Sequence, residues 1–171
     1  MVLEKLGESL RETLRKIAGA SHISPELIKE NGVGILYLNS PSKRNSLTVQ
    51  DMLLIRLLLE DQDHSDIAAL IITGKGNVFC SGADLKWMQS IASEKNKTHD
   101  KAMKMSMKFG EIFTKISSLS KVTISVVEGA CMAGAVGIAS ATDFLVSTSD
   151  AKYALTETKI GLTPAQIAPY I

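Results

Sequence analysis

The chain has 171 residues, and 45% of them are apolar, which is enough for one domain with a substantial core. Lys and Arg number 19 and Asp and Glu number 18, so the net charge of +1 gives no electrostatic case for a nucleic-acid or anionic-membrane partner. The apolar runs stay short of the roughly 20 residues that a membrane span needs. We therefore expect neither nucleic acid nor membrane as a partner.

The first 30 residues are predicted to form a helical segment distinct from the rest. Apolar side chains recur at the three- and four-residue spacing of an amphipathic helix, at Leu3, Leu6, Leu10, Leu14 and Ile17. Ser24 and Pro25 are typical of an N-cap and a first helical position, which predicts a second helix over residues 25–30. The segment lacks the apolar centre of a secretory signal, and its glutamates disfavour a transit peptide, so we expect a cytoplasmic protein.

Residues 31–171 alternate strand and helix patterns, which predicts an α/β domain. Apolar runs, several of them rich in β-branched residues, predict strands at residues 34–38, 69–73, 122–127, 144–147 and 153–155. Thr48 is predicted to begin a helix, because Asp51 three residues later forms an aspartate version of the capping box. A further helix is predicted over residues 101–118.

Two glycine-containing segments each leave a predicted strand and enter a predicted helix, at residues 79–85 (FCSGADL) and 128–137 (EGACMAGAVG). Small residues let the backbone approach a ligand, and free N–H groups at a helix start attract developing negative charge. Two such donors facing one point would form an oxyanion hole. Tight packing between strand and helix explains the glycines equally well, and spacing leaves both explanations open. Neither segment matches a phosphate loop or the full dinucleotide-binding fingerprint.

These segments resemble the signature of the crotonase (enoyl-CoA hydratase/isomerase) family. Residues 39–47, 79–88, 128–143 and 151–164 are similar to four motifs of that family, in the family's order. The resemblance covers residues 32–171 and implies a crotonase-like spiral of ββα units. The C-terminal helices of the family are expected to be lacking, so residues 31–171 are interpreted as an incomplete acyl-CoA-binding core.

The resemblance also implies roles for individual residues. The backbone N–H groups of Ala83 and Gly134 would bind the thioester oxygen, and Glu157 would be the catalytic acid/base. The residues expected to bind CoA are Lys43, Arg44, Ser46, Ser81, Asp84, Leu85 and Lys86. For the charged side chains Lys43, Arg44 and Lys86, a solvated surface position is the alternative. No metal and no cofactor are expected, because coenzyme A is part of the substrate.

Gly137 departs from the pattern of many hydratases, which carry a second glutamate at this position. A glycine cannot transfer a proton, so the usual water addition with two carboxylates is not available. The segments GADLKWM and GLTPAQIAPYI and the Val136–Gly137 pair are most similar to bacterial methylglutaconyl-CoA hydratases. This predicts a lyase of leucine degradation that adds water to a branched enoyl-CoA. The alternatives are an enoyl-CoA isomerase that uses one glutamate and a non-catalytic CoA-binding fragment.

Three further expectations concern assembly, origin and the cysteines. The resemblance implies a homotrimer or hexamer for a complete protein. Residues 1–30 differ from the crotonase pattern and resemble the first helices of a signal recognition particle GTPase, without the phosphate loop of such an enzyme. Cys80 and Cys131 are expected to be buried and reduced, and the three histidines have no metal-ligand spacing.

Overall fold

The computed structural model describes residues 24–63, 66–84, 86, 98–160 and 163–171. Its larger elements are β1 (Glu26–Glu30), β2 (Val33–Leu38), α2 (Val49–Asp63), β3 (Ala69–Gly74), α4 (Thr98–Ser117), β4 (Val122–Val127), β5 (Ala130–Met132), α5 (Gly134–Ser140), β6 (Phe144–Ser147) and β7 (Lys152–Ala154). Short 3-10 helices within the described residues are η2 (Pro41–Lys43), η3 (Glu157–Ile160) and η4 (Ala168–Tyr170). None of the described helices combines the length and the apolar character that crossing a membrane requires.

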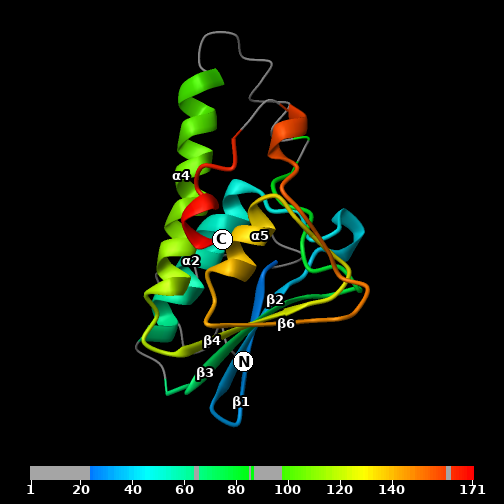
Figure 1. Ribbon diagram of the computed structural model, residues 1–171. Coiled ribbons are helices and arrows are strands. Elements are labelled where there is room, and N and C mark those ends of the chain that lie inside the picture. The colour runs from blue at the N-terminus through cyan, green and yellow to red at the C-terminus, as the bar shows by residue number, and fades with distance from the viewer. Residues whose placement is uncertain (1–23, 64–65, 85, 87–97, 161–162) are drawn as a thin grey trace.

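A five-stranded main sheet forms one layer, with the strand order β1-β2-β3-β4-β6. β1 runs antiparallel to β2, and the remaining neighbours are parallel. Figure 1 shows α2, α4 and α5 together over one face of this sheet. Parallel neighbours need crossover connections, and here helices supply them.

The core lies between the main sheet and these helices. Alternate strand residues point into it, and Leu36, Leu70 and Ile72 are at most 1% exposed. Helix α4 contributes Phe109 and Phe113, which are also buried. The other face of the strands keeps partly exposed side chains, as the alternating burial of β2 and β4 shows.

The predicted strands after residue 31 are confirmed, with small differences at their ends. The helix predicted from Thr48 is confirmed too, because the Thr48 amide and hydroxyl both donate to the Asp51 carboxylate, at 2.8 and 2.7 Å. The helix predicted over residues 101–118 is confirmed as α4. The mixed α/β architecture predicted from alternating strands and helices is likewise confirmed.

The helix predicted over residues 25–30 is wrong. Glu26–Glu30 form strand β1, with Ile28 opposite Ile35 of β2. The run ELIKE has no local strand signal, but pairing with β2 supplies backbone hydrogen bonds and buries Leu27, which is 5% exposed. Tertiary pairing therefore overrides local propensity here. The first predicted helix, which carries Leu3 to Ile17, lies outside the described residues.

Candidate functional site

Four short segments lie side by side and carry the candidate site. β5 pairs in parallel with β7. Isolated bridges continue this order beyond β5, from Cys131 to Cys80 and from Ala83 to Leu47. Because all these pairings are parallel, the segments end on the same side. The residues that follow β5, β7 and the Cys80 bridge therefore come together.

The amides of Ala83 and Gly134 belong to two turns that touch each other. Each amide follows a residue with positive φ, Gly82 at 89° and Ala133 at 52°. A Cβ built on Gly82 would lie 3.7 Å from the Gly134 nitrogen and 2.9 Å from the Ala133 Cβ. Within the described part of the chain, neither amide donates a main-chain hydrogen bond. Two unused donors on adjoining turns are suited to binding an oxyanion.

The glycines of α5 face the aromatic side chains of α4. A Cβ on Gly134 would lie only 2.6 Å from Cε1 of Phe109, and a Cβ on Gly137 would overlap the ring of Phe113. Phe113 is fully buried, so its ring has little space into which it can move. Position 137 therefore accepts no side chain, and the missing second glutamate has a packing explanation.

Glu157 follows β7 at the same end of the small sheet. Met132 lies opposite Ala154, so Gly134 and Glu157 leave neighbouring parallel strands at similar heights. Oε2 of Glu157 is buried and has no hydrogen-bond partner in the described structure. Burial raises the pKa of this carboxyl above its ordinary 4.5, and a backbone hydrogen bond of Glu157 opposes the rise. A carboxyl group with a raised pKa is suited to proton transfer near neutral pH.

Asn45 holds the loop of the predicted CoA-binding residues, although Asn45 itself is not among the residues predicted from the sequence. Its side chain is 1% exposed and accepts a hydrogen bond from the Ser40 amide at 2.8 Å. Its Nδ2 donates to the carbonyl oxygens of Lys75 at 2.9 Å and Val78 at 2.7 Å. Asn45 also has a φ of 53°, a conformation that asparagine tolerates better than most residues. The residue type is therefore the only feature of the sequence that hints at the special backbone conformation of position 45.

The two halves of the predicted CoA-binding set are linked. The Ser81 amide donates to the Arg44 carbonyl at 3.0 Å, and the Ser46 hydroxyl donates to the Asp84 carboxylate at 3.5 Å. The side chains of Lys43, Arg44 and Lys86 are exposed. Leu85 lies outside the described residues. The structure thus brings residues 43–46 and 81–84 together but leaves the cations on the surface.

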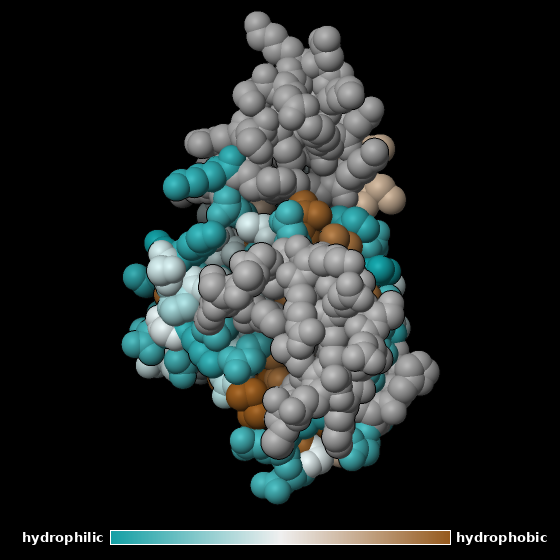
Figure 2. Space-filling view, turned by 180° about the vertical axis from the view of Figure 1, so that it is seen from behind, coloured by the Kyte–Doolittle hydropathy of each residue, from teal (hydrophilic) through white to brown (hydrophobic). Residues whose placement is uncertain are grey.

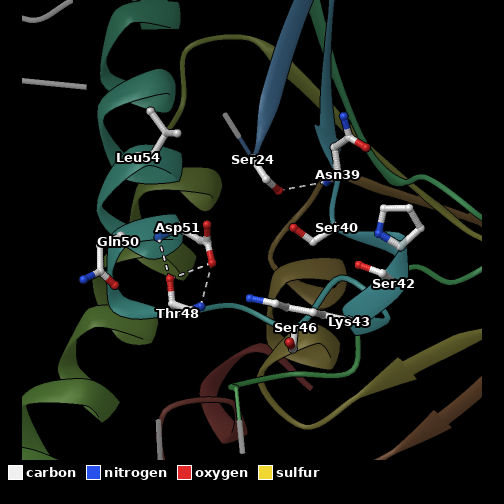
Figure 3. A pocket seen from close by; sticks show the side chains of 11 residues that line it. Ser24, Asn39, Ser40, Ser42, Lys43, Ser46, Thr48, Gln50, Asp51 and Leu54 are labelled. Atoms are coloured by element: carbon white, nitrogen blue, oxygen red, sulfur yellow. Dashed lines mark hydrogen bonds between the residues drawn. The ribbon is translucent and has the colours of Figure 1, made fainter. Parts of the chain in front are cut away.

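A cavity of about 620 Å³ adjoins this loop and the first turns of α2. Figure 3 shows the Lys43 side chain directed into it, together with Ser46 and the Thr48–Asp51 pair. Burial raises the pKa of Asp51, while hydrogen bonds from Thr48 and the charge of Lys43 oppose that effect. The lining includes Lys43 and Ser46 of the predicted set, but neither Ala83 nor Gly134 nor Glu157.

Cys80 and Cys131 are free and buried, as predicted. Burial raises the pKa of both thiols to about 12. They are therefore poor nucleophiles at neutral pH, because the thiolate is the reactive form. No group of three His, Cys, Asp or Glu side chains in the described part of the chain is arranged to hold a metal ion.

Comparisons with known proteins agree with this geometry. A family model described as enoyl-CoA hydratase/isomerase matches residues 28–170. Human ethylmalonyl-CoA decarboxylase is 29% identical over 160 residues, which are 92% of this chain and 50% of the relative. An enoyl-CoA hydratase of Alternaria alternata is 29% identical over 149 residues, or 85% of this chain and 46% of the relative.

A crystal structure of an enoyl-CoA hydratase/isomerase from Marinobacter aquaeolei superimposes with a TM-score of 0.79 at 31% identity. The match covers 86% of this chain and 57% of the other. The chain thus spans about half the length of the relatives that it matches.

Proposed function

Since the chain belongs to the enoyl-CoA hydratase/isomerase family, we propose that Ala83, Gly134 and Glu157 act together on one acyl-CoA thioester. The thioester oxygen is held by the amides of Ala83 and Gly134, and the Glu157 carboxylate moves the proton. The observation that carries this proposal is the buried Oε2 of Glu157, which has no hydrogen-bond partner among the described residues and follows β7 at the end of the small sheet where Gly134 follows β5. A buried carboxylate oxygen without a partner is costly, so a catalytic use is a reason for its retention.

The proposed reaction is the addition of water to an enoyl-CoA. The Glu157 carboxylate takes a proton from water as the water oxygen bonds to the β carbon. The electrons of the double bond move to the thioester oxygen, and the two amides stabilise the resulting enolate. The protonated Glu157 then returns its proton to the α carbon. One carboxylate serves both steps, and the net change is the addition of one water molecule.

A branched, carboxylated enoyl-CoA is the proposed substrate. The support is the likeness of residues 82–88 and 161–171 to methylglutaconyl-CoA hydratases. The exposed Lys43, whose side chain is directed into the cavity, suits the negative charges of coenzyme A. A trimeric or hexameric assembly and a cytoplasmic location stay predictions.

A double-bond shift is the second candidate, and the packing of Gly137 favours it. The Phe113 ring leaves no room for a second carboxylate at this position. An isomerase needs only one base, which removes a proton from one carbon and returns it to another. The same enolate and the same two amides would serve this reaction.

The test is an assay of the purified chain with methylglutaconyl-CoA, crotonyl-CoA and a 3-enoyl-CoA. Ethylmalonyl-CoA joins the panel because a decarboxylase of that compound is among the relatives. We expect hydration of methylglutaconyl-CoA, and we expect Glu157→Gln to lower kcat by about 10²- to 10⁴-fold. The matched control is Glu30→Gln at an exposed position on β1, which should behave like the parent.

Calorimetry with a CoA ester separates catalysis from binding. Glu157→Gln should bind the ester about as well as the parent, because the variant keeps both amides. Binding without turnover in the parent would favour the non-catalytic alternative. Turnover that is unchanged in Glu157→Gln would overturn the proposed role of this residue.

A further inference from the structure

The direction of the Ala83 amide is fixed by a main-chain pairing with Leu47. The Leu47 amide donates to the Gly82 carbonyl oxygen at 2.8 Å, and the Asp84 amide donates to the Leu47 carbonyl oxygen at 2.9 Å. A trans peptide group is planar, and its N–H points away from its C=O. The bond to the Gly82 oxygen therefore sets the direction of the Ala83 N–H, which belongs to the same peptide group. Leu47 is 3% exposed, so water competes little for these bonds.

Asp51 reaches this pairing through a single peptide group. The Thr48 amide and hydroxyl both donate to the Asp51 carboxylate, as the dashed lines of Figure 3 show. The Thr48 N–H belongs to the same peptide group as the Leu47 C=O, which accepts the Asp84 amide. One peptide plane thus lies between the Asp51 carboxylate and the residue after Ala83. Hydrogen bonds from a backbone N–H to a carboxylate are about twice as strong as neutral ones.

The setting of Asp51 differs from that of most charged side chains, which stay on the surface. Figure 2 shows hydrophilic, teal atoms over most of the described part of one face. Asp51 is half-buried instead, and its burial raises the pKa of this carboxyl against the opposing effect of the Thr48 hydrogen bonds. Burial of a carboxylate is costly unless hydrogen bonds compensate it. The bonds that compensate it here also hold the chain at Thr48 in one position.

Asn45 and Asp51 hold opposite ends of the segment formed by residues 45–48. Asn45 fixes its beginning, through hydrogen bonds to the carbonyl oxygens of Lys75 and Val78. Asp51 fixes its end, where the segment pairs with residues 82–84. The two side chains therefore have separate tasks, and the task of Asp51 concerns the turn that presents the Ala83 amide.

We propose that Asp51 is a positioning residue, which holds the Ala83 amide in the direction that the reaction needs. The inference rests on the function proposed above, in which this amide stabilises the enolate. A misdirected donor weakens the transition state more than the bound substrate, because the oxygen carries the larger charge in the transition state. Loss of Asp51 should therefore lower kcat and leave KM nearly unchanged.

The first test compares turnover in two variants of Asp51 with the parent. Asp51→Ala should lower kcat about tenfold or more, short of the roughly 10²- to 10³-fold loss that follows removal of a whole oxyanion donor. KM should stay within about twofold of the parent value. Asp51→Glu should return kcat to within about threefold, since glutamate is the usual acid at this position of a capping box.

The matched control is Gln62→Ala at the other end of α2. Gln62 is fully buried, and its Nε2 donates to the Leu58 carbonyl oxygen at 3.1 Å. Its removal should destabilise the same helix without a change in kcat. Equal losses of kcat in Asp51→Ala and Gln62→Ala would overturn the inference in favour of a purely structural role. A change in KM alone would overturn it as well.

Amide hydrogen exchange, followed by NMR, tests the turn without turnover. In Asp51→Ala, the amides of Leu47 and Asp84 should exchange about tenfold faster than in the parent, because this segment opens more often. The Met132 amide donates to the Cys80 carbonyl oxygen at 3.0 Å on the other side of the turn, and its exchange should change less than about twofold. Unchanged exchange at Leu47 and Asp84 would overturn the inference whatever the assay gives.

The parent and Glu157→Gln separate this inference from the proposed function. If the parent is active and Glu157→Gln is not, the proposed function stands, and an unchanged kcat in Asp51→Ala overturns the inference alone. If the parent has no turnover, the proposed function fails, and the exchange result alone decides whether Asp51 holds the turn.

Discussion

The loop that ends at Ser46 and the start of α5 flank the candidate site, and they are held in place differently. The loop depends on one buried side chain, Asn45, whose hydrogen bonds reach four backbone groups. The start of α5 depends on Gly134 and Gly137, against which the rings of Phe109 and Phe113 pack directly. The loop is thus held by polar contacts. The start of α5 is held by close packing that is possible only because Gly134 and Gly137 have no side chains.

This difference predicts how each side responds to change. When the Asn45 side chain is removed, all its hydrogen bonds are lost together, but the loop has space in which to adjust. Close packing against a fully buried ring leaves no such freedom, because protein interiors are as dense as organic crystals. The side of α5 should therefore be the less tolerant of the two, and substitutions can test this.

Gly137→Ala should have the largest effect on stability. The added methyl group would overlap the Phe113 ring. Overpacking typically costs about 1 to 3 kcal/mol and occasionally more, and the full burial of this ring puts the expected loss at or above the upper end of that range. Urea unfolding measures the loss. Gly110→Ala in α4 is the matched control, since its Cβ would meet only the end of the Gln166 side chain, which can move. Gly110→Ala should change the free energy of unfolding by about 1 kcal/mol or less.

A double-mutant cycle sharpens the same comparison. In Phe113→Ala the ring is gone, so adding Gly137→Ala should cost far less than it costs in the parent. If the two changes instead have additive effects, the ring is not what excludes a side chain from position 137.

Asn45→Ala should have the next largest effect, a loss of about 2 to 4 kcal/mol. It removes the hydrogen bonds to Ser40, Lys75 and Val78, each of which contributes about 1 kcal/mol, and it puts an alanine at positive φ. Asn45→Gly tolerates this φ and should lose somewhat less. The control is Ser42→Ala at an exposed position in the same loop, which should leave urea unfolding unchanged.

Glu157→Gln should have the smallest effect on stability, and it should raise the free energy of unfolding rather than lower it. Burial raises the pKa of Glu157, so ionisation of this carboxyl opposes folding. The fold is free of this penalty below about pH 4.5 and acquires it as the pH rises through the folded-state pKa. The Tm of Glu157→Gln should exceed that of the parent at pH 7, and the gap should close at low pH. A gap that grows on acidification would contradict this assignment.

The sequence predicted most of the fold because most elements have a clear local period. The strand at residues 122–127 and the capped helix after Thr48 depend on neighbours within a few residues. β1 was missed because its strand form depends on pairing with β2, and the run ELIKE has no alternating pattern of its own. The Ser24–Pro25 pair even favours a helix start.

The candidate site was predicted by resemblance, and its supports were not. Ala83, Gly134 and Glu157 sit in recognisable motifs, and the structure places them at one end of the small sheet. Asn45 meets Val78, and Phe113 meets Gly137, across more than twenty residues of sequence. Contacts at such separations have no local pattern, so only the folded chain shows them.

Main-chain donors have a consequence for how such a protein can change over generations. A point mutation replaces a side chain and leaves the peptide N–H in place, unless the new residue is proline. The amides at positions 83 and 134 therefore survive most substitutions as chemical groups, although the packing of Gly134 against Phe109 limits which residues can stand at that position. Side chains outside the close contacts of Gly134 and Gly137 can change, so the proposed site can acquire a new acyl preference while it keeps both main-chain donors.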